Sequence, residues 1–407
     1  MLATLIPLFD KEMNVCAYSV FAQRENNLLN PFLAGTGSLD ASSSIMGLSL
    51  VDSMGIENLS GDRSCFVSVD NVSIFTDIAA QCKAPANKIA LLIDSTVKPK
   101  EMYINRVAEL KLKGYKIAVR RLSIDQFEPY LPILSHADYM LLDHRKINID
   151  NARVYFSKRY PNISLVAINV NTIDEFENLG AKDAYSLYEG AFFRMPKVDP
   201  DEAVAPLKMT YIELLNIVNA PDFDLTDAAD VVGHDTALVL SLLEMVNRMS
   251  VSGGISSVRH AAAMLGQKEL KRWINTAVTK ELCADKPSEI IRISLLRAKF
   301  CENLAKLFEL AHMSQELFLM GLFSVLDVML DKPIEEALEI VTVSQPIYNA
   351  LVRGTGDLAP VLNFVREYEN ASWQEISRLM ILKGIDMDPV FDAYVNSLEW
   401  YRDLFLK

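Results

Sequence analysis

The chain has 407 residues and a formal net charge of −13, with 50% hydrophobic and 23% charged residues. This composition excludes a largely disordered chain and is typical of a globular protein with room for two or three domains. The acidic balance argues against nucleic acid as a partner, because proteins that bind the phosphate backbone are usually basic over that surface.

The cysteines and the apolar segments indicate the compartment. Five cysteines are scattered without a CxxC pair, so we expect free thiols in a reducing environment. The first ten residues lack the basic start and the cleavage site of a signal peptide. The longest apolar stretch, 317–330, is too short to span a bilayer. The sequence therefore predicts a cytoplasmic protein with no membrane contact.

Short apolar runs alternate with helical patterns through the first 197 residues. Runs rich in Val, Ile, Leu and aromatic residues predict strands at 16–21, 65–69, 89–93, 116–119, 139–142, 165–168 and 184–185. Intervening segments such as 102–113 have helical spacing. Strands separated by helices pair in parallel, so seven or eight such units predict an α/β fold, a compact (β/α) barrel over residues 1–197.

The predicted strand at 116–119 is followed directly by an arginine pair, Arg120 and Arg121. In a (β/α) barrel, catalytic groups lie at the carboxyl ends of the strands. Two guanidinium groups at such a position repel a divalent cation, so the pair disfavours metal-dependent chemistry there. Because neighbours on a strand point to opposite faces, we expect only one of the two to face the barrel mouth.

A segment with two prolines and three acidic residues, 198–206, predicts a linker between two domains. Beyond it the pattern is helical, as in the spacing of Leu238, Leu242 and Met245. Ser372 and Glu375 have the spacing of a capping box at a helix start. The sequence therefore predicts an all-α domain over residues 207–407.

Several segments occur in an order that is typical of one group of signalling proteins. They are 9–15, 114–118, 137–143 and 189–196 in the first half, and 242–247, 255–262 and 265–270 in the second. In these segments the first half resembles the EAL family of cyclic di-GMP phosphodiesterases. The second half resembles the HDOD domain, a catalytically silent relative of the HD phosphohydrolases. The resemblance implies a TIM-like EAL barrel followed by an all-helical HDOD domain.

Active EAL enzymes share a ring of carboxylates that binds two metal ions and positions a water. The resemblance places the family's active-site positions on Ser19, Ser68, Leu92 (or the displaced Asp94), Arg120, Arg121, Leu141, Asp143, Ile168, Asn171 and Glu189. Of these, Ser68, Leu141 and Glu189 fall on the family's asparagine, lysine and glutamine, and the others on its carboxylates. Only at Asp143 is the family's aspartate kept. Because Mg²⁺ and similar ions need carboxylate oxygens, the resemblance implies a degenerate site with no metal, no cofactor and no catalytic residue, hence no enzyme.

Two roles for Arg120 and Arg121 stay open. One or both could pair with Asp94, Asp143 or Glu189, since the guanidinium fork suits carboxylates. Alternatively, one arginine grips a phosphate, so that the barrel binds a nucleotide without a metal.

The dipeptide His234–Asp235 has the residue types of an HD metal site. Asp235 stands directly before an apolar helical run, so we expect it to cap that helix. The His–Asp pair of the resembling family falls instead on Ser324 and Val325, which cannot replace metal ligands.

These observations favour a catalytically inactive, cytoplasmic signal-transduction protein that acts by binding a protein partner, with a homodimer plausible by analogy. One alternative is a metal-independent receptor for cyclic di-GMP or another nucleotide, held by Arg120 or Arg121. The other alternative is residual cyclic di-GMP phosphodiesterase activity.

Overall fold

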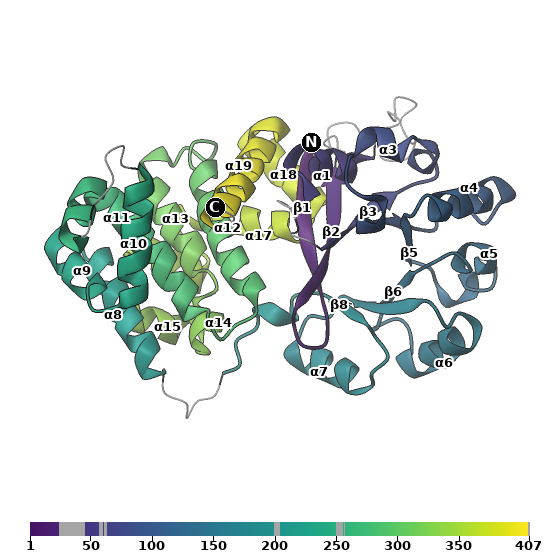
Figure 1. Cartoon of the computed structure of the whole chain (residues 1–407), viewed down its shortest axis with the longest axis horizontal. Coiled ribbons are helices and arrows are strands. Elements are labelled where there is room, and N and C mark those ends of the chain that lie inside the picture. Colours follow the sequence, from purple (N-terminus) through teal and green to yellow (C-terminus); the bar gives the residue numbers. More distant parts are fainter. Residues whose placement is uncertain are drawn as a thin grey trace. The chain divides into compact units, whose positions relative to one another are not determined.

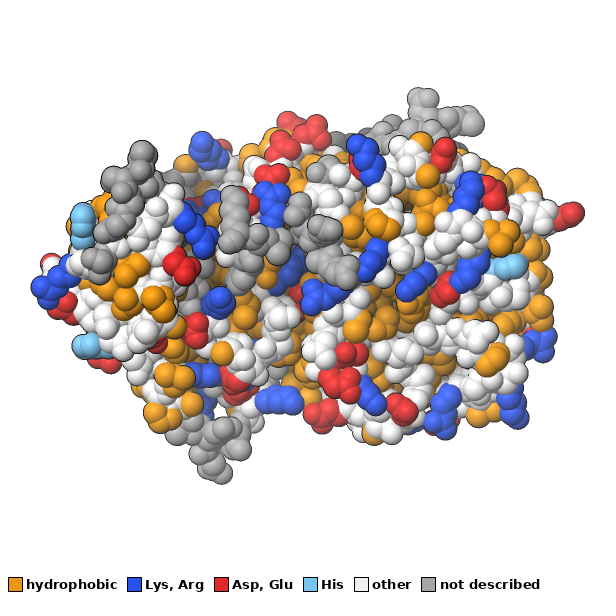
Figure 2. Space-filling model, in the orientation of Figure 1, with side chains coloured by type: hydrophobic (Ala, Val, Ile, Leu, Met, Phe, Trp, Pro, Cys, Tyr) orange, Lys and Arg blue, Asp and Glu red, His pale blue; other side chains and the backbone are white. Residues whose placement is uncertain are grey.

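The structure is a computed structural model that describes residues 1–23, 45–56, 60, 63–198, 204–249, 255 and 257–405. Residues 199–203 of the predicted linker lie outside these ranges. None of the described helices is both long enough and apolar enough to cross a membrane. On the face drawn in Figure 2, basic and acidic side chains are interspersed rather than gathered by sign.

Eight strands of the described chain close into a barrel and follow one another around it in sequence order (Figure 1). They are β1 (Leu2–Phe9), β2 (Val15–Gln23), β3 (Ser64–Val69), β4 (Ile89–Ile93), β5 (Lys116–Arg120), β6 (Tyr139–Asp143), β7 (Ser164–Ile168) and β8 (Leu187–Glu189). β1 is antiparallel to both of its neighbours, and the pairs from β2 to β8 are parallel. The predicted barrel is confirmed, with the β1–β2 hairpin added to the parallel pattern.

Helices of the barrel are fixed by short local signals at their starts. They are α1 (Met46–Met54), α3 (Ile78–Gln81), α4 (Glu101–Leu112), α5 (Leu131–Leu134), α6 (Ile149–Arg159) and α7 (Ile173–Ala181). The Asn148 side chain caps α6, and Thr172 with Glu175 forms a capping box on α7. These caps hold the loops that follow β6 and β7, which belong to the open end of the barrel.

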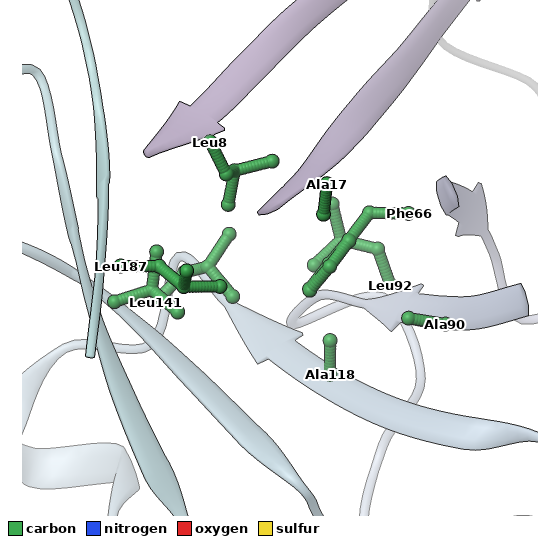
Figure 3. Close-up of a cluster of buried hydrophobic side chains, with 9 residues drawn as sticks. Leu8, Ala17, Phe66, Ala90, Leu92, Ala118, Leu141 and Leu187 are labelled. Carbon is green, nitrogen blue, oxygen red and sulfur yellow. The ribbon is translucent and has the colours of Figure 1, made fainter. Parts of the chain in front are cut away.

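A packed apolar core fills the inside of the barrel. Side chains from successive strands meet there (Figure 3), and they are Leu8, Ala17, Phe66, Ala90, Leu92, Ala118, Leu141, Val166 and Leu187. Leu92 and Leu141, two of the positions that the resemblance places in the family's active site, are members of this core. Polar chemistry is therefore confined to the carboxyl ends of the strands, as is usual in such barrels.

Every element described from residue 204 onward is a helix, so the predicted all-α region is confirmed. Its helices are α8 (Pro206–Asn219), α9 (Leu225–Val232), α10 (Thr236–Met249), α11 (Val258–Leu282), α12 (Ser288–Leu304), α13 (Ser314–Phe323), α14 (Leu326–Leu330), α15 (Ile334–Ile340), α16 (Gln345–Tyr348), α17 (Ala359–Glu369), α18 (Trp373–Lys383) and α19 (Met387–Phe405). The chain divides into two compact units, and residues 303–312 and 363–407 belong to the same unit as the barrel. The sequence-predicted domains assign these two segments to the helical half.

The segment 363–407 covers an edge of β1 that the barrel leaves open. β8 pairs with β1 only at Leu8 and Phe9, because β8 has three residues and β1 has eight. Farther along β1, the backbone N–H of Ala3 donates to the hydroxyl of Tyr368 over 3.2 Å, and both residues are buried. The C-terminal helices thus supply the acceptor that a longer β8 would have supplied.

The start of α18 was predicted correctly in place but not in its bonding. The helix begins at Trp373, directly after Ser372. The Ser372 side chain makes no capping hydrogen bond, so the predicted capping box is wrong. Instead, the backbone N–H of Ser372 donates to the carbonyl of Glu367 and closes the end of α17.

Replacing Tyr368 with phenylalanine is expected to destabilise the barrel unit by about 1–2 kcal/mol, because the buried N–H of Ala3 loses its acceptor. The matched control is Tyr394→Phe, whose hydroxyl contacts the Thr4 side chain over 3.5 Å instead of a backbone N–H of β1. Hydrogen exchange of the β1 amides measures the difference. Equal protection of β1 in the two variants would contradict this account of the edge.

Candidate functional site

A cavity of about 1020 Å³ opens at the carboxyl ends of β5 to β8. Its wall is formed by the loops that follow these strands, by residues of β1 and β2, and by residues 369–371 of the C-terminal segment. The charged side chains that line it are Arg120, Arg121, Asp125, Asp143, Lys146, Glu189, Arg194 and Glu369. We call this cavity the barrel mouth.

Both arginines of the pair line the barrel mouth. Arg120 ends β5, and its guanidinium carbon lies 4.9 Å from the centre of the Phe21 ring. Arg121 is exposed and has a left-handed φ of 57°, which breaks the alternation of the strand. The prediction that only one of the two would face the mouth is therefore wrong, because alternation holds only while the backbone stays extended.

Neither guanidinium has a hydrogen bond or an ion pair within the part of the chain that the structure describes. The three acids proposed as partners are engaged elsewhere. Asp94 accepts from Thr96, and Glu189 accepts from Ser19 over 3.1 Å. Asp143 contacts Arg145, Lys146 and Asn169, over 3.2, 3.7 and 3.1 Å. The geometry therefore leaves two cations of the mouth available to an anion.

Burial sets the charge states at this end of the barrel. Loss of hydration, and next the charge of Arg121, lower the pKa of Arg120 to about 10, while Glu189 and Asp94 oppose the shift. Arg120 thus stays charged at neutral pH. Burial also raises the pKa of Glu189 above its usual value, against the hydrogen bond from Ser19 and the two arginine charges.

The remaining positions of the resemblance do not come together as a ligand set. Ser19 is buried, Ser68 is exposed, and Ile168 packs beside the apolar core. Asn171 lines the mouth, and its backbone N–H donates to Glu175. Among the described residues no three His, Cys, Asp or Glu side chains form a group that would hold a metal. The donor set of the mouth, with two free guanidinium groups, does not fit a pair of divalent cations.

Sequence reasoning missed the other wall of the mouth. Arg194, in the 3₁₀ turn Phe192–Arg194 after β8, pairs with Glu369 over 3.3 Å. Asn370 and Ala371 continue the wall. The segment 189–196 was noted only as part of the barrel framework. No local pattern marks Glu369, because it lies 175 residues from its partner.

The helical unit confirms the capping role of Asp235. Its Oδ1 accepts from the backbone N–H groups of Ala237 and Leu238 over 2.8 and 3.0 Å, at the start of α10. At the position of the family's His–Asp pair, the buried hydroxyl of Ser324 accepts from Arg297 over 3.0 Å. This position holds a neutral hydroxyl beside a cation.

Comparison with known proteins matches residues 204–342 to the HDOD domain. The chain is 29% identical over 350 residues to the cyclic di-GMP phosphodiesterase CdgJ of Vibrio cholerae, covering 84% of this chain and 79% of that protein. It is 26% identical to the uncharacterised protein YuxH of Bacillus subtilis, covering 98% of this chain and 97% of that one.

Solved structures of EAL proteins also match the first half. A standalone EAL protein of Vibrio cholerae, bound to cyclic di-GMP, is 16% identical with a TM-score of 0.36, covering 46% of this chain and 89% of that chain. Two further solved structures, the EAL enzyme Bd1971 with cAMP and cyclic di-GMP and BlrP1 of Klebsiella pneumoniae, are 9% and 13% identical, with TM-scores of 0.35 and 0.37. Each match covers 46% of this chain, and 60% and 54% of those chains.

One prediction from the sequence is contradicted. The absence of metal-ligand carboxylates predicted that the chain is not an enzyme, whereas the 29% identical relative, aligned over most of both chains, is a cyclic di-GMP phosphodiesterase. The loss of ligands was inferred position by position from one sequence, and such a placement does not determine the activity of a whole protein. The chain combines a closed eight-stranded barrel, formed by its described N-terminal strands, with a region at residues 204–342 that matches the HDOD domain.

Proposed function

We propose that this chain is a cyclic di-GMP signalling protein whose barrel mouth binds the nucleotide through Arg120 and Arg121. The observation that carries the proposal is the pair of guanidinium groups that, among the described residues of the cavity, have no hydrogen bond or ion pair. The similarity to a cyclic di-GMP phosphodiesterase over 84% of this chain supports cyclic di-GMP as the nucleotide.

The chemistry of the mouth suits a phosphodiester. The guanidinium group offers two parallel N–H donors to the two non-bridging oxygens of a phosphate. A cavity of about 1020 Å³ is at the upper end of the size of small-molecule sites. Arg120 is partly desolvated against Phe21, which strengthens its attraction for an anion relative to a fully hydrated side chain.

Hydrolysis of the bound nucleotide is the second candidate function, and the activity of the CdgJ relative favours it. The donor set of the mouth does not supply a metal pair, so we derive no metal-dependent step from it. Transfer of the signal to a protein partner, homodimer formation and the division into domains at 1–197 and 207–407 are retained as predictions.

Calorimetric titration with cyclic di-GMP tests the proposal, in Mg²⁺, in Mn²⁺ and in excess chelator, with the products separated by chromatography. We expect saturable binding that persists in chelator. The absence of saturable heat under all three conditions would overturn the proposal. Release of linear dinucleotide above a buffer control would establish hydrolysis as well as binding.

The affinity for cyclic di-GMP is expected to fall as pH rises through the raised pKa of Glu189. Below that pKa the carboxyl is neutral. Above it, the carboxylate repels the phosphodiesters, which stay ionised throughout, and it partly neutralises Arg120. Titrations over a series of pH values that rises from the usual glutamate pKa measure the effect. In Glu189→Gln this pH dependence should disappear, and an unchanged profile in that variant would assign it to another group.

A further inference from the structure

Arg194 is a further cation of the barrel mouth, and it already forms an ion pair with the carboxylate of Glu369. Arg194 Nη1 lies 3.3 Å from Glu369 Oε2, and their side chains are only 19% and 14% exposed. Glu369 is the last residue of α17, and both residues line the same cavity as Arg120 and Arg121. Among the cations that line the mouth, Arg120 and Arg121 have no internal ion pair, whereas Arg194 is paired with Glu369 and Lys146 with Asp143.

A cyclic dinucleotide carries two phosphodiester groups on one ring. One of them can approach Arg120 and Arg121 directly. The other, at Arg194, would compete with the carboxylate that Arg194 Nη1 now contacts. We propose that Glu369 is an internal competitor for the second phosphodiester, so that binding of cyclic di-GMP displaces it from Arg194. This inference rests on the proposed function and adds a second anion position and its regulation.

The backbone that follows Glu369 allows this side chain to leave Arg194 through a local change. Ala371 has a left-handed φ of 53°, a conformation that costs a residue with a Cβ about 1–2 kcal/mol. Its N–H donates to the carbonyl of Tyr368, and the N–H of Ser372 donates to Glu367, which closes the helix end. Tyr368 itself is anchored on β1. Movement of Glu369 would thus loosen one helical turn and leave the docking of the segment intact.

The displacement of Glu369 would act on α17, a helix that contains residues of both compact units. α17 begins at Ala359, and the boundary between the two compact units falls within it, between Leu362 and Asn363. A nucleotide that releases the C-terminal end of α17 changes a helix to which both units contribute residues. The ligand state of the mouth would in this way reach the region that carries the HDOD domain.

Glu369→Gln tests the competition directly. The variant keeps the shape of the side chain and removes its charge, so we expect it to bind cyclic di-GMP about 5- to 10-fold more tightly than the unmodified chain, as for a modest coupling between sites. Binding of GMP, which has a single phosphate group, should change far less. The matched control is Glu375→Gln, which removes a carboxylate paired with Arg378 outside the mouth and should leave both affinities unchanged.

Hydrogen exchange gives a second readout that needs no variant. Cyclic di-GMP should increase the exchange of residues 366–372 in the unmodified chain while β1 stays protected. Unchanged affinity in Glu369→Gln together with unchanged exchange in this segment would overturn the inference and leave the proposed function standing. Weaker binding in Glu369→Gln would also overturn it, because Glu369 would then contact the ligand favourably. No binding by the unmodified chain would instead overturn the proposed function.

Discussion

Replacing Arg121 with alanine is expected to weaken cyclic di-GMP binding about 10- to 100-fold, since a charge-assisted hydrogen bond contributes about 1.5–3 kcal/mol and 1.4 kcal/mol is a factor of ten. The side chain is exposed and has no partner among the described residues, so its removal leaves no internal group unsatisfied. The loss of affinity therefore reports the ligand contact and not a loss of fold. Calorimetric titration measures it.

A substitution at Arg120 can remove the charge of this side chain while keeping most of its packing. Its guanidinium lies over Phe21 and is partly buried, so Arg120→Met keeps an apolar stem there and removes only the charge. We expect Arg120→Met and Arg121→Ala combined to abolish measurable binding. The control is Arg153→Ala, an exposed arginine of α6 that donates to the carbonyl of Lys182 outside the mouth. Equal affinities of Arg121→Ala and Arg153→Ala for cyclic di-GMP would show that the arginine pair does not bind the nucleotide.

Much of the barrel could be predicted from the sequence because its strands are short apolar runs between helical segments. β4 and β6 are fully or largely buried runs of this kind, and their predicted limits agree closely with the structure. β1 was missed because its run contains Pro7, which weakens a strand pattern. β8 was placed at 184–185 instead of 187–189, since three residues give little periodicity.

The site could be predicted only in part. The residues after β5 were identifiable, because the end of a barrel strand has a known location. Whether the arginines pair with nearby acids depends on side-chain positions that local pattern does not encode, and Asp143 turns out to be held by Arg145 and Asn169. The left-handed backbone at Arg121 could not be predicted, because arginine is not a residue type that marks this conformation, as glycine does. The contact of Arg194 with Glu369 could not be predicted either, because it joins distant segments of the chain.

Among the described glycines of the helical unit, Gly321 in α13 is the one where an added methyl group should cost most. A Cβ there would lie 2.5 Å from the carbonyl oxygen of Arg297 and 2.6 Å from the backbone nitrogen of Ala298, both in α12. Backbone atoms of a neighbouring helix cannot rotate away as a flexible side chain can. The close approach also sets two buried hydrogen bonds, from Arg297 to Ser324 and from Ser294 to the carbonyl of Leu322.

Gly321→Ala is therefore expected to destabilise α12 and α13 by about 3 kcal/mol or more, through overpacking and loss of these buried hydrogen bonds. In an unobstructed helix the same substitution would stabilise by about 0.5–1 kcal/mol, because alanine restricts the unfolded chain. Gly180 in α7 is the matched control, since its added Cβ would lie 3.9 Å from the hydroxyl of Tyr188 and clash with nothing. Hydrogen exchange measures both helices. A loss of stability in Gly321→Ala together with a gain in Gly180→Ala would show that the close spacing of α12 and α13, rather than helix propensity, requires glycine at 321. A Gly321→Ala variant of unchanged stability would contradict this, because α13 would then be able to move away from α12.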